Sequence, residues 1–373
     1  MDLSSLRPGA WRKLLPRGRP KRPIRIRQFR PSVEVLEDRW VPANLTWVGP
    51  AGGKWSVAAN WAPAQVPGNG DILFFSGDTK NTDSTMDLGG GVFYHIAGLQ
   101  IGSSYTKTIT LQSSLYVDVL DMQGGTIDGA KSFIIWQVTQ GTIIPATNFG
   151  TSFFRGGTIK TDVYTQGEAV HQVTLKLAGG NATPDLEANL TTDKYTTMEW
   201  RGGDMIVAGG KTITVNWSFL ADSNGTIGNN TANWNLIINP GGALSRGKGT
   251  FNKVNETIKG KLFKVGSTIP GGTDVFVVIG SVTQDTGGTT EVQSGTLVVQ
   301  GDFTQTSGST IVDAGQTLSV TGNVFENGGT FTLAGGTLSA TTVQIAPGAE
   351  LGGSGTIAAD VTNAGVIDVG GSS

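Results

Sequence analysis

The chain has 373 residues, of which 56 are glycine and 15% are charged, and its formal net charge at pH 7 is −2. It contains no cysteine, which excludes disulfides, zinc–thiolate sites and a cysteine nucleophile. Glycine at this level, without a collagen period and placed between β-branched runs, is typical of turns. The composition therefore favours an all-β protein in which short strands alternate with glycine-containing turns.

Residues 1–43 differ from the rest of the chain. Residues 1–40 contain 11 Lys or Arg and 4 Asp or Glu, a balance of +7, whereas residues 41–373 contain 16 and 25, a balance of −9. Five prolines between Pro8 and Pro31 interrupt any helix, and no apolar run reaches the length of a signal-peptide core. We predict that residues 1–43 form a disordered basic leader or sorting segment, and not a nucleic-acid-binding tail.

The end of this leader carries a specific pattern. Residues 30–43 read RPSVEVLEDRWVPA, which resembles the LEDR-type leader at the front of large surface or exported bacterial proteins. The resemblance implies an extracellular or cell-surface location. The export route and the cleavage of the leader stay open, because the segment has no apolar signal core.

Residues 44–75 form a tryptophan-rich block. Trp47, Trp55 and Trp61 are followed by Asp71 and Phe75, in the order W-x-G, G-x-W, N-W, P, D-x-x-x-F. This order resembles the segment that opens the β-strand repeats of autotransporter-like secreted proteins. We favour an N-terminal cap, since three indoles would cover the apolar end of a solenoid. The alternative is a ligand site in which the three indole faces stack on glycan rings.

Residues 76–270 carry a looser repeat. The step Gly-Thr-Ile occurs at residues 125–127, 141–143 and 157–159, and later coils are spaced unevenly. Uneven coil lengths predict loops that protrude from a rigid scaffold, which is where binding usually occurs. Near the end of this region, six basic side chains stand against a single acid, Glu256, and form either a solvated face or a contact for an anionic glycan: Arg246, Lys248, Lys253, Lys259, Lys261 and Lys264.

Residues 271–373 carry the regular repeat. Glycines stand ahead of strand-like runs at positions 272, 295, 315, 336 and 355, so the spacings are 23, 20, 21 and 19 residues. Apolar and polar residues alternate within each unit, which is the period of a half-buried strand. A step of about 20 residues built from short strands predicts an elongated β-solenoid, specifically a parallel β-helix. Nine residues are expected to point inward: Leu297, Val299, Leu318, Val320, Phe331, Leu333, Leu338, Val343 and Ile345.

The repeat continues to Val369 without a polar capping coil. Because an uncapped coil presents unpaired backbone groups and apolar side chains, we expect the C-terminal coil to self-associate.

The sequence offers no convergent catalytic set. His95 and His171 lack a serine or carboxylate neighbour in a recognisable motif, and we expect neither to act as a base. Asp118 and Asp121 are three residues apart on an expected strand and are predicted to face opposite sides.

One further pattern resembles a nucleotide site by spacing alone. Gly242, Gly247 and Lys248 have the spacing of a phosphate loop, but Gly249 replaces the Ser or Thr that would hold magnesium. We expect no cofactor, no metal and no nucleic-acid partner.

These observations predict a non-catalytic secreted or cell-surface β-solenoid with a structural or adhesin-like role and a glycan or cell-surface ligand. The alternative is a polysaccharide-binding or polysaccharide-cleaving β-helix, since a β-helix scaffold hosts both functions. No apolar stretch is long enough to predict a transmembrane segment.

Overall fold

The structure, a computed structural model, describes residues 42–89, 94–136, 151–169, 172–177, 182–271 and 273–370. The predicted leader therefore lies outside the described residues apart from Pro42 and Ala43, as do His171 and the Gly-Thr-Ile step at 141–143. Within these ranges the chain forms 33 strands and one 3-10 turn, Ala58–Asn60, and no α-helix.

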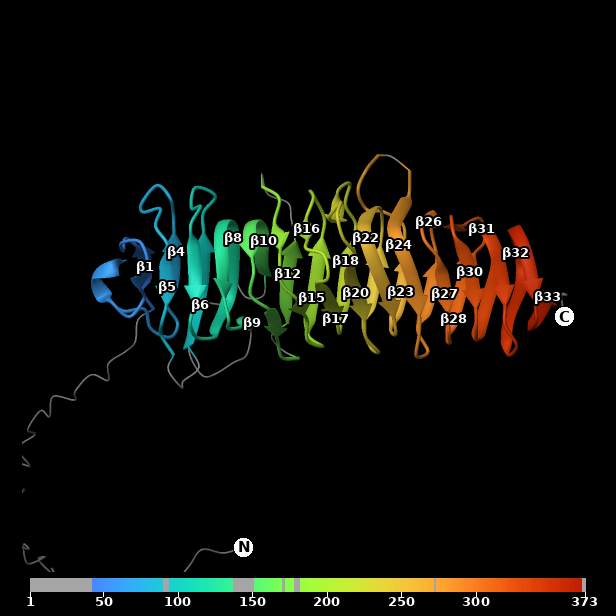
Figure 1. Cartoon of the computed structure of the whole chain (residues 1–373), viewed down its shortest axis with the longest axis horizontal. Coiled ribbons are helices and arrows are strands. Elements are labelled where there is room, and N and C mark those ends of the chain that lie inside the picture. Colours follow the sequence, from blue (N-terminus) through green and yellow to red (C-terminus); the bar gives the residue numbers. More distant parts are fainter. Residues whose placement is uncertain are drawn as a thin grey trace, which may run out of the picture. The chain divides into compact units, whose positions relative to one another are not determined.

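The pairings between strands arrange them in three columns. Figure 1 shows the coils following one another along the stack in sequence order, from β1 to β33. The first column contains β1 (Asn44–Trp47), β4 (Ile72–Phe75), β12 (Val173–Leu177), β15 (Thr196–Trp200), β18 (Ser218–Ala221), β21 (Ala243–Arg246), β23 (Lys261–Lys264), β25 (Thr289–Val292), β28 (Ser309–Asp313) and β33 (Val366–Val369). The second contains β2 (Gly53–Lys54), β5 (Ser84–Met86), β7 (Thr108–Leu111), β13 (Asp185–Leu186), β16 (Ile206–Val207), β19 (Thr226–Gly228), β26 (Thr296–Val299) and β29 (Thr317–Val320). The third contains β9 (Phe133–Trp136), β11 (Val163–Gln166), β14 (Leu190–Thr191), β17 (Thr212–Val215), β20 (Trp234–Ile238), β27 (Phe303–Gln305) and β30 (Asn323–Glu326).

Seven longer strands turn a corner and contribute to more than one column: β6 (Tyr94–Ile101), β8 (Leu115–Gly129), β10 (Thr151–Ile159), β22 (Gly249–Ile258), β24 (Val275–Gln284), β31 (Gly329–Ile345) and β32 (Ala349–Asn363). The pairings between coils are parallel throughout the described residues, as in β24 with β26 and β26 with β29. Among the described strands, the single antiparallel pairing joins β1 to β3 (Trp61–Ala62), within the first coil. The predicted parallel β-helix is confirmed, and it has three sides.

Because apolar and polar residues alternate along each strand, every second side chain points into the interior of the coil. The nine residues predicted to point inward are all buried, with at most 3% of their surface exposed. They lie above one another in ladders, as Leu297 pairs with Leu318 and Leu318 with Leu338. The period of two and the step of about 20 residues together determine this core.

The glycines ahead of these strands serve two different purposes. Gly295 and Gly315 have φ of +70° and +74°, in the left-handed region that glycine adopts without strain. Gly336 and Gly355 have no positive φ, but a Cβ there would collide with Val312 and with Gly336 of the preceding coil, respectively. Close approach between coils therefore explains the second pair.

Candidate functional site

The three tryptophans of the first coil are core residues. Trp47, Trp55 and Trp61 are at most 1% exposed, and each indole ring lies 5.2 to 5.9 Å, centroid to centroid, from another indole or from Phe75. Each indole N–H is satisfied: Trp47 donates to Thr82 Oγ1, Trp55 to Ser84 Oγ and Trp61 to the carbonyl of Trp55, as the three hydrogen bonds show. No indole face is left exposed, so glycan stacking on these three residues does not hold in this structure.

The structure corrects the prediction for His95. Its Nε2 lies 2.5 Å from Asp118 Oδ1, across neighbouring coils, so this histidine does have a carboxylate neighbour. Burial raises the pKa of Asp118, while the hydrogen bond and the charge of His95 act in the opposite direction. Asp121 instead accepts a hydrogen bond from Arg155 at 2.9 Å. The two carboxylates therefore have different partners and do not form an acid–base pair.

The basic run near residue 250 divides into inward and outward groups. Arg246 and Lys264 are 0% exposed, and alternation could have revealed this, since both have the inward parity of Leu244 and Leu262. Arg246 forms an ion pair with the equally buried Glu256. Its guanidinium carbon also lies 4.8 Å from the ring centroid of Phe276. These charges belong to the interior and are not a ligand surface.

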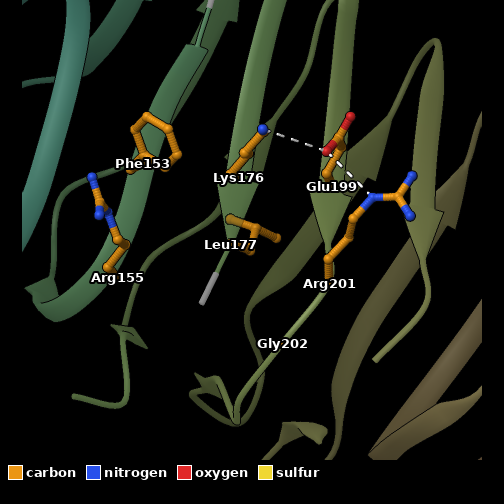
Figure 2. A pocket seen from close by; sticks show the side chains of 7 residues that line it. All are labelled: Phe153, Arg155, Lys176, Leu177, Glu199, Arg201 and Gly202. Carbon is orange, nitrogen blue, oxygen red and sulfur yellow. Dashed lines mark ion pairs between the residues drawn. The ribbon is translucent and has the colours of Figure 1, made fainter. Parts of the chain in front are cut away.

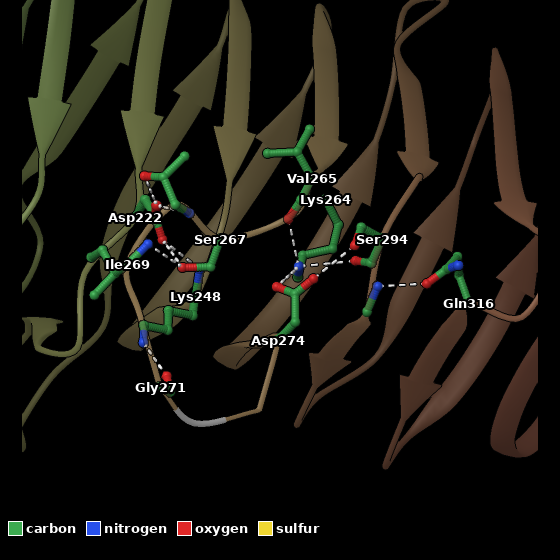
Figure 3. Close-up of polar contacts among 12 residues, drawn as sticks. Asp222, Lys248, Lys264, Val265, Ser267, Ile269, Gly271, Asp274, Ser294 and Gln316 are labelled. Atoms are coloured by element: carbon green, nitrogen blue, oxygen red, sulfur yellow. Dashed lines mark hydrogen bonds and ion pairs between the residues drawn. The ribbon is translucent and has the colours of Figure 1, made fainter.

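Polar contacts hold the loop between β23 and β24 against the body of the β-solenoid (Figure 3). Lys264 Nζ donates to Asp274 Oδ1 at 2.6 Å and to the carbonyl of Ser294 at 2.9 Å. Burial lowers the pKa of Lys264, although Asp274 opposes the shift. Lys248 Nζ donates to the carbonyl of Gly271 at 2.6 Å. Lys248 is thus a loop anchor, and its ammonium group binds backbone carbonyls of the loop.

Asp222 is the other anchor of this loop. Its carboxylate accepts hydrogen bonds from Ser267 Oγ at 2.6 Å and from the backbone N–H and the hydroxyl of Thr268 at 2.8 and 2.7 Å. Burial favours a raised pKa for Asp222, but these hydrogen bonds and one from the backbone of Lys248 outweigh it and lower the pKa. The loop is therefore held near its start by Asp222 and at its end by the contact between Lys264 and Asp274.

Two of the outward lysines, Lys259 and Lys261, line a groove of about 710 Å³ at the corner between the third and first columns. Four successive turns form it, and its wall includes Trp217, Phe263, Lys259 and Lys261, with glycines between them and no carboxylate among the lining residues. We call it the Trp217 groove. Trp217 is 46% exposed because it stands in the two-residue turn between β17 and β18, where its indole cannot reach the interior. No sequence motif marks this residue, and only its place in a polar turn could have drawn attention to it.

A second cavity, of about 240 Å³, opens on the first column (Figure 2). Phe153, Arg155, Lys176, Glu199 and Arg201 line it, from β10, β12 and the end of β15. Glu199 Oε2 lies 3.5 Å from Arg201 Nε and 4.0 Å from Lys176 Nζ. We call it the Arg201 cavity. Because the single carboxylate of Glu199 is shared by Lys176 and Arg201, this cavity has a net positive charge.

Arg155 adds a third cation to this cavity. Its guanidinium carbon lies 4.3 Å from the ring centroid of Phe153, and its Nη2 is paired with Asp121. The side chains of Arg155, Lys176 and Arg201 are 32%, 43% and 50% exposed, so a ligand could reach all three.

The described residues offer neither a metal-binding cluster nor a membrane-spanning helix. These residues contain no group of three or more His, Cys, Asp or Glu side chains placed to hold a metal ion. They also contain no helix long and apolar enough to cross a membrane.

Comparison with known proteins gives no family for this chain. No protein-family model matches the sequence, and neither the curated proteins nor the solved structures include a significant match.

Proposed function

We propose that this protein is a non-catalytic, adhesin-like β-solenoid of the cell surface or the secreted fraction, and that it binds an acidic polysaccharide in the Trp217 groove. The observation that carries the proposal is the exposed indole of Trp217 beside Lys259 and Lys261 in a groove without acidic lining. The apolar C–H face of a sugar ring packs on an indole, and a lysine attracts the carboxylate or sulfate of the same sugar.

The side chains of the groove favour binding of a polysaccharide over its cleavage. Neither Lys259 nor Lys261 lies within ion-pair distance of an acid among the described residues, although hydrogen bonds and, to a lesser extent, the charge of Lys259 lower the pKa of Asp285 nearby. Both ammonium groups can therefore meet an external anion. The groove has no His, Asp or Glu among its lining residues, and these are the side chains that most often act as acid–base catalysts. This supports binding without cleavage.

Binding to a panel of immobilised polysaccharides tests the proposal. We expect the whole protein to retain polyuronates and sulfated glycans but not neutral dextran, with affinity falling as salt concentration rises. Trp217→Ala should abolish retention. Tyr164→Ala is the matched control, because Tyr164 is a 41% exposed aromatic on β11, two coils before β17, and lines neither cavity. Equal loss in both variants, or equal binding to dextran, contradicts the proposal.

The proposed location rests on the resemblance of residues 30–43 to LEDR-type leaders. Cells expressing the whole chain, or the chain without residues 1–43, should be fractionated and the mature N-terminus sequenced. We expect only the whole chain to reach the surface or the medium. Export of both forms would contradict a sorting role for the leader.

A further inference from the structure

We infer that the Trp217 groove and the Arg201 cavity are two parts of one track, along which an extended, carboxylate-bearing polysaccharide lies parallel to the axis of the solenoid. The inference rests on the proposed function and adds the orientation of the polymer, its minimum length and a second set of contacts.

The register of the first column connects the two cavities. Glu199, which lines the Arg201 cavity, pairs with Leu220 on β18, and Ser218 of the same strand lines the Trp217 groove. A single outward row runs through both sites, and its members follow one another by direct pairing: Phe153, Lys176, Glu199, Leu220, Ser245 and Phe263. The two cavities are therefore adjacent on one face.

The dimensions of the row suit a polymer and exceed a single sugar. Paired strands are about 4.8 Å apart, so the five steps from Phe153 to Phe263 span roughly 24 Å. One strand spacing is close to the length of one sugar residue in an extended chain. A ligand that reaches both ends of the row consequently needs about five or six sugars, at about 4.8 Å for each.

The charges and rings along the row are complementary to such a ligand. The two cavities contribute five cations to the track, against two acids: Glu199, which is shared by Lys176 and Arg201, and Asp121, which is paired with Arg155. An arginine donates two parallel hydrogen bonds to a planar carboxylate, which favours uronic acids at the end of the row where Arg155 and Arg201 stand. An aromatic ring lies at each end, Phe153 and Phe263, where a sugar face can pack.

A length series of oligouronates tests the track, with affinity measured by calorimetry on the whole protein. We expect affinity to rise with length up to about six sugars, the span of the row, and then to level off. Arg201→Ala and Arg155→Ala should each weaken the longest oligomer about tenfold, as expected for one lost charge-assisted contact, and leave the disaccharide unchanged. Trp217→Ala should weaken every length.

Lys107→Ala is the matched control, because Lys107 is an exposed lysine in the turn before β7, in the second column. Thermal melting of each variant confirms that it is folded, and Arg201→Gln repeats the test with a smaller change of volume. Two results would contradict the track but not binding in the Trp217 groove. One is an affinity that levels off at the disaccharide, and the other is native affinity of both arginine variants for the longest oligomer. If Trp217→Ala binds normally, the proposed function itself fails. Tighter binding of single-stranded oligothymidylate than of the oligouronate overturns both.

Discussion

Two interior regions of the solenoid bury charge in different ways. In the coils around β21 and β22, Arg246 faces Glu256, and both side chains are 0% exposed. In the coils around β27 and β30, Glu326 is equally buried but stacks on Gln305, with no ion-pair partner among the described residues. A narrow solenoid core therefore accommodates a charge by pairing it, and accommodates a lone acid by raising its pKa, which favours the protonated form.

The lone acid belongs to a polar ladder. Gln284 pairs with Gln305, and Gln305 with Glu326, while Ile345 follows in the next coil. Thr310 Oγ1 donates to Gln305 Oε1 at 2.6 Å. Burial and the negative charge of Glu350 raise the pKa of Glu326 to about 8, although backbone N–H groups of Phe331 and Glu350 oppose the shift.

The largest effect should come from breaking the ion pair. Arg246→Met leaves Glu256 buried without its partner, and we expect the free energy of unfolding to fall by about 3–5 kcal/mol. The double variant Arg246→Met/Glu256→Leu should recover most of this loss, because no charge is then left in the core. Urea denaturation measures both, with Lys107→Met as the surface control. A single variant as stable as the native protein would show that Glu256 finds another partner.

The second prediction concerns the pH dependence of the lone acid. The pKa of Glu326 is higher in the folded state than in the unfolded state, so the folded state is favoured where the carboxyl is protonated. The contribution of Glu326 to the free energy of unfolding is therefore complete below pH 4.5 and decreases as the pH rises to about 8. The loss amounts to several kcal/mol, at about 1.4 kcal/mol per pKa unit. We expect Glu326→Gln to remove this pH dependence from the melting temperature.

Two further variants sharpen that measurement. Glu350→Gln should move the sensitive pH range downward, because it removes a negative charge that raises the pKa of Glu326. Glu187→Gln, on a side chain that is 41% exposed, should change nothing. Parallel pH curves for the native protein and Glu326→Gln would show that the carboxyl is hydrated in the folded state.

The smallest effect on stability should come from the last described coil, where interior positions have a neighbour on one side only. Val366 is 53%, Ile367 41% and Val369 82% exposed, and β33 pairs with β32 alone among the described strands. We propose that this coil self-associates. Val366→Lys and Ile367→Lys should leave melting nearly unchanged but suppress association in sedimentation. A native protein that remains monomeric at high concentration would refute self-association.

Some of this protein could be predicted from the sequence alone. The period of two and the repeated step near 20 residues determined the parallel solenoid and its nine interior ladder residues in the regular region, because each strand buries alternate side chains against like residues one coil away. The tryptophans of the first coil were recognised as a cluster by their spacing, although their burial was only one of two interpretations.

Other features were decided only by the tertiary structure. Alternation indicates that Arg246 and Lys264 face inward, but their partners, Glu256 and Asp274, come from other strands or loops. The partner of His95 likewise stands 23 residues away in the next coil. The two cavities arise because turns and strands from successive coils of unequal length lie beside one another, which no local pattern specifies. Local alternation gives the side of a strand on which a residue lies, but the contacts of that residue are made between coils and follow from their stacking.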